Sequence, residues 1–318
     1  MTNDLMVRVA RRINEAVSIC SFELVSHDGE TLPAFTAGSH IDVHVAPGLV
    51  RQYSLSNDPS EKDRYRIAVL REEASRGGSA GMHDNIAVGQ ILRVSPPRNH
   101  FPLTDAPRSL LLAGGIGVTP ILSMARALHA QGKTFEMHYC GRSLNRMAFV
   151  EEIGASGFAR FVSLHADDMP EQRLDLPALL AGAPDSTHLY VCGPGGFMDH
   201  VLATARAHGW LEARLHREYF AGSVKALASD GIFTVRLAST GLTCDVPADR
   251  TIVEVLAAHG IDVPTSCEAG VCGTCLTRVL EGTPDHRDTF LTDAERAASD
   301  QFTPCCSRSL TPLLVLDL

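Results

Sequence analysis

The chain has 318 residues, of which 45% are hydrophobic and 20% charged, and its formal net charge is −9. Because a single core rarely exceeds about 250–300 residues, this length predicts two or three domains, and the composition excludes wholesale disorder. The acidic balance argues against nucleic acid or an anionic membrane as a partner. The longest nearly apolar run, Leu110 to Val118, is far too short to span a bilayer, and the N-terminus lacks the apolar segment of a secretion signal. We therefore expect a cytoplasmic protein.

The first 105 residues predict an antiparallel β-barrel. Short segments of alternating polar and apolar residues are separated by turn signals such as His27-Asp28-Gly29 and Asn57-Asp58-Pro59. Six such segments are typical of a small barrel, and one helical segment, Ser79–Ile86, interrupts them. The expected strands are Val7–Ile13, Ser18–Ser26, His40–Val45, Gln52–Ser56, Arg64–Arg71 and Gln90–Val94.

Two segments of this region suit a phosphate and a planar ring. Arg51-Gln52-Tyr53-Ser54 lies on an expected strand, where the guanidinium can clamp a phosphate and the phenol can stack on a ring. Arg76-Gly77-Gly78-Ser79 opens the expected helix, where free N–H groups can cradle an anion. An ordinary barrel strand and a flexible loop are the alternative interpretations.

Residues 106–225 predict alternating strands and helices. Leu110–Ala113 is a continuous apolar run, which is typical of a strand buried on both faces. The residues after Pro120 have the spacing of an amphipathic helix that ends at Gly132. Such alternation indicates a parallel sheet in an α/β domain. Further buried strands are expected at Phe135–Cys140, Phe161–His165 and Leu189–Cys192.

Glycine-rich turns follow two of these strands. Gly114-Gly115-Ile116-Gly117 leads into a helix that we expect to have Thr119 as its N-cap and Pro120 as its first residue, with free N–H groups facing a pyrophosphate. Cys192-Gly193-Pro194 follows the second strand, and ligands of open α/β sheets bind at the carboxyl ends of strands. Simple tight turns and a buried thiol are the alternatives.

The cysteines gather toward the C-terminus. Their total of nine is odd and does not indicate a disulfide framework in a reducing compartment. Cys267, Cys272 and Cys275 have the C-x4-C-x2-C spacing of a plant-type [2Fe–2S] site, whose fourth ligand lies farther along the chain. Cys305 or Cys306 can complete the set, and the separation of about thirty positions from Cys275 favours Cys305. A zinc site, with only one C-x2-C pair, and scattered buried thiols are the alternatives.

Other residues support this interpretation of the cysteine loop. Gly270 and Gly273 permit positive φ and close backbone approach, so N–H groups can point at the sulfurs. Cys20, Cys140 and Cys244 lie in strand-like segments, and we expect them to be inert core thiols.

Residues 231–318 predict a separate acidic domain behind a linker at 222–231. Phe233–Leu237 and Thr243–Val246 have the pattern of a hairpin, and Thr251–His259 that of a helix. The segment has twelve acidic and six basic side chains, a net charge of −6. This charge favours docking on a basic partner, and solubility alone is the alternative.

Together, and in this order, the motifs resemble the phthalate dioxygenase reductase family over essentially the whole chain. The resemblance implies a multidomain protein with an FMN-binding antiparallel β-barrel at 1–105, an NAD-binding α/β domain with a parallel sheet at 106–225, and a ferredoxin domain of the α+β, β-grasp type at 231–318. It implies FMN, NADH and a plant-type [2Fe–2S] cluster as cofactors.

The resemblance also assigns residues. Phe220 matches the aromatic residue that lies against the isoalloxazine, and Thr119 and Cys192 match positions near the flavin and nicotinamide, so these three are the implied catalytic residues. Arg142 matches a position at the adenosine 2′ group, where an arginine can tolerate a 2′-phosphate, although the family favours NADH. The implied FMN contacts are Arg51, Gln52, Tyr53, Ser54, Ala68, Val69, Leu70, Arg76, Gly77, Gly78 and Ser79. The implied NAD contacts are Gly114, Gly115, Gly117, Thr119, Cys192, Gly193 and Pro194. The implied cluster ligands are Cys267, Cys272, Cys275 and Cys305.

The function implied is an NADH-dependent reductase that passes electrons through FMN and the cluster to a terminal oxygenase of aromatic-compound degradation, of the Rieske non-haem iron type. The alternatives are a reductase for a P450 or another acceptor, and a flavin reductase with a zinc-stabilised C-terminal interaction module. We expect neither nucleic acid nor a membrane as a partner, and we expect the protein to be a monomer.

Overall fold

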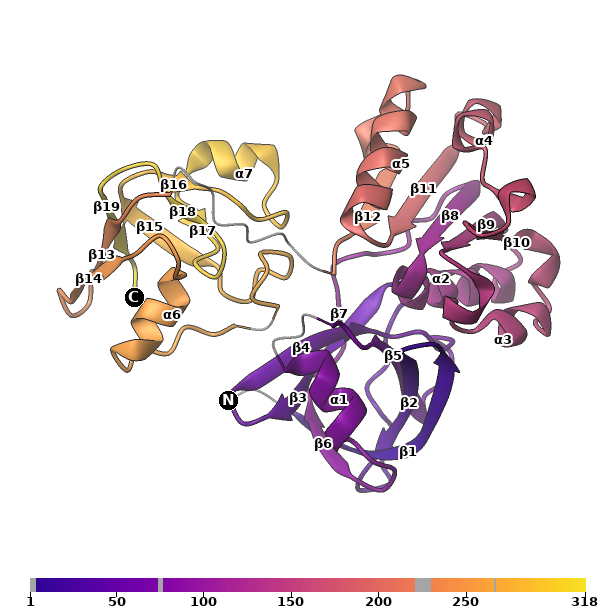
Figure 1. The fold of residues 1–318 in the computed structure, drawn as a ribbon, viewed down its shortest axis with the longest axis horizontal. Coiled ribbons are helices and arrows are strands. Elements are labelled where there is room, and N and C mark those ends of the chain that lie inside the picture. The colour runs from indigo at the N-terminus through magenta and orange to yellow at the C-terminus, as the bar shows by residue number, and fades with distance from the viewer. Residues whose placement is uncertain (1–3, 74–76, 221–229, 266) are drawn as a thin grey trace. The chain divides into compact units, whose positions relative to one another are not determined.

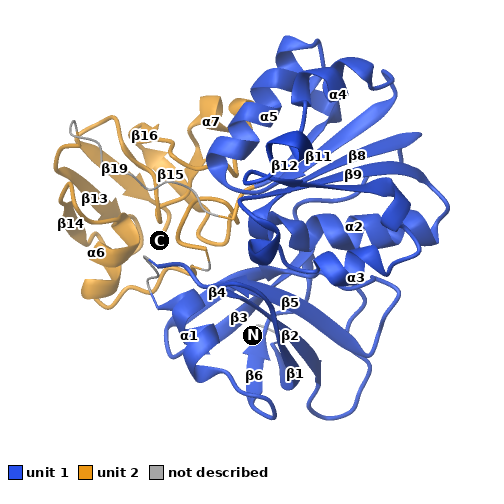
Figure 2. Ribbon diagram, turned by 45° about the vertical axis from the view of Figure 1, so that its right-hand side comes forward, with its two compact units in different colours: residues 1–218 blue, residues 219–318 orange. Residues whose placement is uncertain are grey.

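The computed structural model describes residues 4–73, 77–220, 230–265 and 267–318. The chain divides into two compact units, residues 1–218 and residues 219–318 (Figure 2). In the described part of the chain, no helix has the length and apolar character needed to cross a membrane.

An antiparallel sheet forms the N-terminal part of the first unit (Figure 1). Its hydrogen-bonded order is β4-β3-β6-β1-β2-β5, with the short β7 paired to β3. All six expected strands and the expected helix are present, with ends that differ by a few residues. Side chains from alternate strand positions, such as Val7, Val9 and Phe22, build a fully buried core. The elements are β1 (Leu5–Ala16), β2 (Ile19–Ser26), β3 (Ser39–Ala46), β4 (Leu49–Ser54), β5 (Arg64–Leu70), α1 (Gly78–Asn85), β6 (Ile91–Val94) and β7 (Arg98–Asn99).

The expected parallel sheet follows in the same unit, in the order β10-β9-β8-β11-β12. Its central strand β8 is buried from Ser109 onward, because helices cover both faces of such a sheet. The sequence did not predict β12, α3 or α4, which are short or carry few apolar positions. The elements are β8 (Arg108–Gly114), α2 (Val118–Ala130), β9 (Thr134–Gly141), α3 (Val150–Gly154), β10 (Val162–Ala166), α4 (Leu176–Gly182), β11 (Thr187–Cys192), α5 (Gly195–Ala207) and β12 (Leu215–Glu218).

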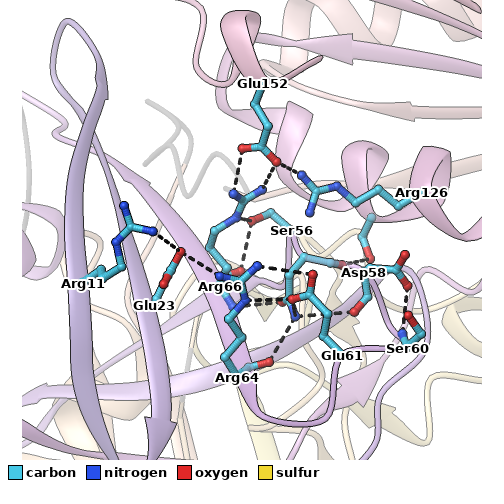
Figure 3. A network of polar contacts seen from close by, with 12 residues as sticks. Arg11, Glu23, Ser56, Asp58, Ser60, Glu61, Arg64, Arg66, Arg126 and Glu152 are labelled. Carbon is cyan, nitrogen blue, oxygen red and sulfur yellow. Dashed lines mark hydrogen bonds and ion pairs between the residues drawn. The ribbon is translucent and has the colours of Figure 1, made fainter. Parts of the chain in front are cut away.

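A polar network joins the two sheets within the first unit (Figure 3). Arg66 of β5 donates two hydrogen bonds, of 2.7 and 2.9 Å, to the Glu152 carboxylate of α3. Arg126 of α2 pairs with the same carboxylate. Burial, with the neighbouring Arg66 guanidinium, lowers the pKa of Arg126 to about 10. One carboxylate therefore serves two largely buried cations and ties β5 to two helices of the parallel sheet.

The second unit contains a five-stranded mixed sheet in the order β14-β13-β19-β15-β17. β13 and β14 form the expected antiparallel pair, and β13 runs parallel to β19. Thr251 caps the expected helix by accepting a hydrogen bond from the N–H of Glu254, and Thr292 caps α7 in the same way. Most of the expected linker at 222–231 lies outside the described residues. The elements are β13 (Phe233–Leu237), β14 (Thr243–Val246), α6 (Ile252–Ala258), β15 (Thr277–Glu281), β16 (Pro284–Asp285), α7 (Asp293–Ala298), β17 (Gln301–Phe302), β18 (Arg308–Ser309) and β19 (Leu313–Leu316).

We expect Glu152→Gln to lower the free energy of unfolding of the intact protein by about 2 kcal/mol, because two guanidiniums lose the counter-charge that they share. This is less than the ~3–5 kcal/mol of a fully buried pair, since the Glu152 side chain is 38% exposed. Urea unfolding measures the change. As a control, Glu212→Gln removes the exposed partner of Arg206 and should cost under about 0.5 kcal/mol. Equal effects of the two substitutions would contradict the role given to Glu152.

Candidate active site and cysteine centre

The two glycine-rich turns pack against each other at the carboxyl ends of β8 and β11. A Cβ on Gly117 would lie 2.2 Å from the carbonyl oxygen of Cys192, and one on Gly193 would lie 2.9 Å from the Cα of Gly114. A Cβ on Gly114 would lie 2.8 Å from the Phe197 ring. Backbone thus meets backbone at this point, which only glycine permits. Pro194 is the N-cap of α5.

The expected N-cap of α2 is wrong. The helix begins at Val118 with Gly117 as N-cap, and no side chain caps it. A 3₁₀ turn at Gly115–Gly117 runs directly into the helix, so helical geometry starts earlier than the position of Pro120 suggested. The Thr119 hydroxyl instead donates a 3.1 Å hydrogen bond to the carbonyl oxygen of Ile116, and the residue is 2% exposed.

Three uncharged polar groups meet beside these turns. Cys192 ends β11, pairs in register with Glu218 of β12, and is fully buried. The hydroxyl of Ser54 on β4 donates a 3.0 Å hydrogen bond to Oε2 of Glu218. Burial raises the pKa of Glu218 to about 8, and burial followed by the nearby Glu218 raises the pKa of the Cys192 thiol. At neutral pH the group therefore holds a thiol and a protonated carboxyl. The sequence analysis missed Glu218, because its role depends on the pairing of β11 with β12.

A second cluster of predicted residues lies around β4 and the start of α1. A Cβ on Gly78 would lie 2.6 Å from Cγ and Nε of Arg51, so the first turn of α1 packs on this guanidinium stem. The Tyr53 hydroxyl is buried and has no hydrogen-bond partner among the described residues. Such an orphaned donor fits a site that a polar ligand completes. Gly77 has φ +89°, which favours glycine, and Arg76 lies outside the described residues.

The other predicted contacts occupy different positions. Nε2 of Gln52 lies 3.3 Å from Nε2 of His40, and Ser79 accepts a hydrogen bond from the N–H of Glu72. Ala68–Leu70 lies on β5, and Arg142 is exposed just past the carboxyl end of β9. Phe220 is 38% exposed and belongs to the second unit, whereas the other predicted flavin contacts belong to the first.

The second unit brings four thiols together. The Cys267 sulfur hydrogen-bonds with the thiols of Cys272 and Cys305, and the Cys275 sulfur hydrogen-bonds with Cys305. These bonds lower the pKa of Cys267, because its neighbours stabilise the thiolate. Thiolates that meet in pairs suit two iron atoms with two sulfur ligands each. Among the described residues, no group of three or more His, Cys, Asp or Glu side chains is placed so that it could hold a single metal ion.

Backbone N–H groups point at two of these sulfurs, as predicted. The amides of Ala269 and Val271 donate to Sγ of Cys267, and the amide of Thr274 donates to Sγ of Cys272, each over 3.4 Å. Such bonds stabilise thiolates and help to set the potential of a bound cluster.

The shape of the loop depends on Gly270 and Gly273, which have φ of +71° and +70°. A Cβ on Gly270 would lie 2.4 Å from the Cys306 sulfur and 2.9 Å from Cα of Asp288. A Cβ on Gly273 would lie 2.2 Å from the Phe290 ring. The segment 288–290 therefore covers the loop so closely that both positions require glycine, as the sequence analysis predicted.

Neighbouring contacts distinguish Cys305 from Cys306. Cys305 interacts with Cys267 and Cys275 of the loop. The Cys306 sulfur hydrogen-bonds with Cys305 rather than with the loop cysteines, and it lies 3.1 Å from the hydroxyl of Thr303 and 3.8 Å from that of Ser307. The geometry therefore favours Cys305 as the fourth member of the thiol group.

Comparison with known protein families matches both parts of the chain. Residues 235–310 match the 2Fe-2S iron-sulfur cluster binding domain, and residues 92–215 match the N-terminal domain of dimethylamine monooxygenase subunit DmmA-like proteins. The first match covers all four thiols of the cysteine centre.

Full-length relatives are also similar. A vanillate O-demethylase oxidoreductase of Pseudomonas putida is 57% identical over 98% of both chains. The solved structure of a phthalate dioxygenase reductase, described as modular for electron transfer from pyridine nucleotides to [2Fe-2S], is 39% identical, with a TM-score of 0.80 over 99% of this chain and 98% of that one. An intact self-sufficient cytochrome P450 monooxygenase is 40% identical with a TM-score of 0.83, where 99% of this chain matches 41% of that one.

We expect Gly273→Ala to lose most of the iron bound to the purified protein, because the added methyl group would overlap the Phe290 ring. Gly241→Ala is the matched control. Gly241 lies in the same unit with φ +72°, but a Cβ at this position would have no other atom within 4 Å, so the substitution carries only the backbone strain of about 1 kcal/mol. Iron content per chain measures the effect, and equal retention of iron by both variants would contradict this explanation of the loop.

We expect Glu218→Gln to be more stable than the parent at alkaline pH. The unfolded carboxyl ionises near pH 4.5, whereas the folded one keeps its proton to about pH 8, so ionisation increasingly opposes folding of the parent between these values. The melting temperature of the variant minus that of the parent should rise from pH 5 to pH 8 and then level off. Glu171→Gln, at an exposed position of the same unit, should show no such rise. A difference for Glu218→Gln that stays constant with pH would be the contrary result.

Proposed function

Because the chain belongs to the family of oxidoreductases that includes the vanillate O-demethylase oxidoreductases and phthalate dioxygenase reductase, with FMN, NADH and a [2Fe–2S] cluster as cofactors, we propose that it is the NADH-dependent reductase component of a multicomponent oxygenase. Its task is to take electrons in pairs and deliver them singly. The flavin and the cluster supply this conversion when bound, since a flavin exchanges one or two electrons and the cluster only one.

FMN fits the antiparallel sheet, which we interpret as a β-barrel domain spanning 1–105. Arg51 and the first turn of α1, at Gly77 to Ser79, would hold its phosphate, because a guanidinium packs there against the N-terminal end of a helix, which favours anions. The partnerless Tyr53 hydroxyl and the backbone of Ala68–Leu70 would contact the ring system. These residues suit a ligand that has both a phosphate and a planar ring, which supports the assignment of FMN to this sheet.

NADH fits the parallel-sheet domain, which we assign to 106–225. A Cβ on Gly115 after β8 or on Gly195 after β11 would have no other atom within 4 Å, so a ligand can approach the backbone there. Arg142 beyond β9 would face the adenosine end. We assign Thr119, Cys192 and Phe220 to the surroundings of the reacting rings, and add Glu218. The thiol and the protonated carboxyl keep this region free of net charge, which suits the transfer of a hydride between two rings without an acid or base of the protein.

The ferredoxin domain, assigned to 231–318 with a β-grasp fold, would hold the cluster through Cys267, Cys272, Cys275 and Cys305. The meeting of these four thiols under backbone N–H groups is the observation that carries the proposal. The similarity of residues 235–310 to the 2Fe-2S iron-sulfur cluster binding domain supports this cluster over a zinc site.

The electron acceptor that we propose is a terminal oxygenase of the Rieske non-haem iron type that acts on an aromatic compound. The name of the vanillate relative supports an aromatic substrate. A P450 is the second candidate, because the matched self-sufficient P450 carries a similar reductase in one chain. We further propose that the protein acts in the cytoplasm as a monomer, since one chain carries the residues for all three cofactors.

The experiment that tests this function compares two electron acceptors. We expect Cys272→Ser to abolish delivery of electrons from NADH to the oxygenase, because one cluster ligand is lost, while NADH-driven reduction of a neutral quinone dye at the flavin stays largely intact. Cys244→Ser changes another buried thiol of the same unit, outside the thiol group, and should leave both rates unchanged. Equal loss of both rates in Cys272→Ser would contradict the proposed electron order.

The charge of the last domain predicts salt sensitivity. Residues 231–318 have a net charge of −6, so attraction to a basic oxygenase surface should weaken as salt screens it. Turnover with the oxygenase should fall several-fold from about 0.01 to 0.5 M ionic strength, whereas reduction of the neutral dye should stay constant. Oxygenase turnover that does not change over this range would refute electrostatic docking.

A further inference from the structure

One cysteine outside the thiol group has an imidazole and a guanidinium beside its sulfur. Cys20 lies on β2, and its sulfur is 3.6 Å from Nδ1 of His83 in the last turn of α1. Nη2 of Arg12 on β1 donates to the same sulfur over 3.8 Å, and Oδ1 of Asn14 accepts from the thiol over 3.0 Å. Three side chains from two elements thus converge on one sulfur atom.

The hydrogen bonds of His83 fix which ring nitrogen is free to take a proton. Nε2 lies 2.9 Å from the carbonyl oxygen of Val69, which can only accept a hydrogen bond. Nε2 of a neutral His83 must therefore carry the ring proton, and Nδ1 presents its lone pair to the Cys20 sulfur. The thiol donates to Asn14 in this structure, and rotation about its C–S bond turns its proton toward Nδ1. His83 is in this way oriented as a base for Cys20, with a backbone carbonyl as the group that orients it.

Arg12 can stabilise the thiolate that this base would generate. Its guanidinium also donates a 3.1 Å hydrogen bond to the carbonyl oxygen of Ile86 and lies 5.7 Å from the centre of the Phe22 ring. These contacts hold the cation beside the sulfur. An adjacent base and cation are the surroundings that activate cysteines in proteins.

The remaining strand cysteines of the sequence analysis provide the contrast. Cys244 is 4% exposed, as is Cys20, and burial followed by the Asp245 carboxylate raises the pKa of its thiol. Cys140 is more exposed than either, and burial followed by Asp167 raises the pKa of its thiol to about 12. No described contact places a base or a cation on either sulfur.

We propose that Cys20 is an oxidation site for a water-sized peroxide, with His83 as its base and Arg12 as the cation that stabilises its thiolate. The low exposure of Cys20 excludes bulky electrophiles, whereas hydrogen peroxide is hardly larger than water. This assignment does not rest on the function proposed above, and it revises the expectation that Cys20 is inert.

The chemistry balances without a further reactant. His83 takes the thiol proton, and the thiolate attacks one oxygen of hydrogen peroxide. An S–O bond forms as the O–O bond breaks, and the leaving hydroxide takes the proton from His83 to become water. The sulfur loses two electrons and becomes a sulfenic acid, and the peroxide gains them. Added thiol reverses the modification.

Peptide mass spectrometry after timed exposure of the intact holoprotein to hydrogen peroxide tests this proposal. After excess peroxide is quenched, the chain is unfolded in an alkylating agent, so that each remaining thiol is counted. We expect Cys20 to lose its free thiol at least ten times faster than Cys244 in the same sample, and dithiothreitol to restore it. His83→Gln keeps a donor for the Val69 carbonyl but removes the base, and should slow the loss at Cys20 about tenfold.

Two results would overturn the proposal. One is loss at Cys20 that is no faster than at Cys244, which requires no variant and so does not depend on the folding of one. The other is that His83→Gln leaves the rate of thiol loss at Cys20 the same as in the parent, when the rate at Cys244 is also the same in both proteins. Arg12→Gln, which removes the cation, should slow oxidation of Cys20 in the same assay.

Discussion

The protein depends on a loop that folds tightly enough to present three thiols to a fourth from far along the chain. Gly270 and Gly273 take left-handed conformations, and the backbone of Asp288 and the ring of Phe290 lie where a side chain would otherwise be. Within the loop, the amides of Ala269, Val271 and Thr274 donate to the sulfurs of Cys267 and Cys272. The same packing that shapes the loop therefore also provides the hydrogen bonds that stabilise thiolates, and the electron-transfer function rests on it.

In the proposed function, the first unit has a different task, which is to hold the flavin and the nicotinamide ring against each other without a charged side chain between them. The turns after β8 and β11 contact each other through glycine backbone, and at Gly115 and Gly195 a Cβ would have no other atom within 4 Å, so a ligand can approach the backbone there. Cys192 and Glu218 keep their protons because both are buried, and Ser54 reaches the carboxyl from the other sheet. The Arg66–Glu152–Arg126 network ties β5 of the antiparallel sheet to helices α2 and α3, which pack with the parallel sheet. It therefore helps to hold Ser54 of one sheet beside Glu218 of the other.

The sequence predicted those parts of the fold that local patterns encode. Strands with alternating burial and the buried run of β8 are patterns of neighbouring residues, as are the cysteine spacing and the need for glycine at 270 and 273. The expected N-cap at Thr119 was wrong, because the 3₁₀ turn that precedes the helix has no clear residue signature. The sequence did not predict the role of Glu218 or the neighbours of Cys20, because both depend on which strands and helices lie side by side. Such pairings join residues far apart in the chain, and a single sequence does not reveal them.

All of these features serve one proposed task, in which a single chain carries electrons from NADH to a cluster held by Cys267, Cys272, Cys275 and Cys305. Electron paramagnetic resonance of the anaerobic holoprotein, frozen after addition of NADH alone, tests this task without a partner protein. We expect the signal of a reduced [2Fe–2S] centre, at a level approaching one spin per chain. The contrary result has three parts: NADH fully bleaches the flavin, no iron–sulfur signal develops, and dithionite produces that signal in the same protein. It would show that the chain does not carry electrons from NADH to the cluster.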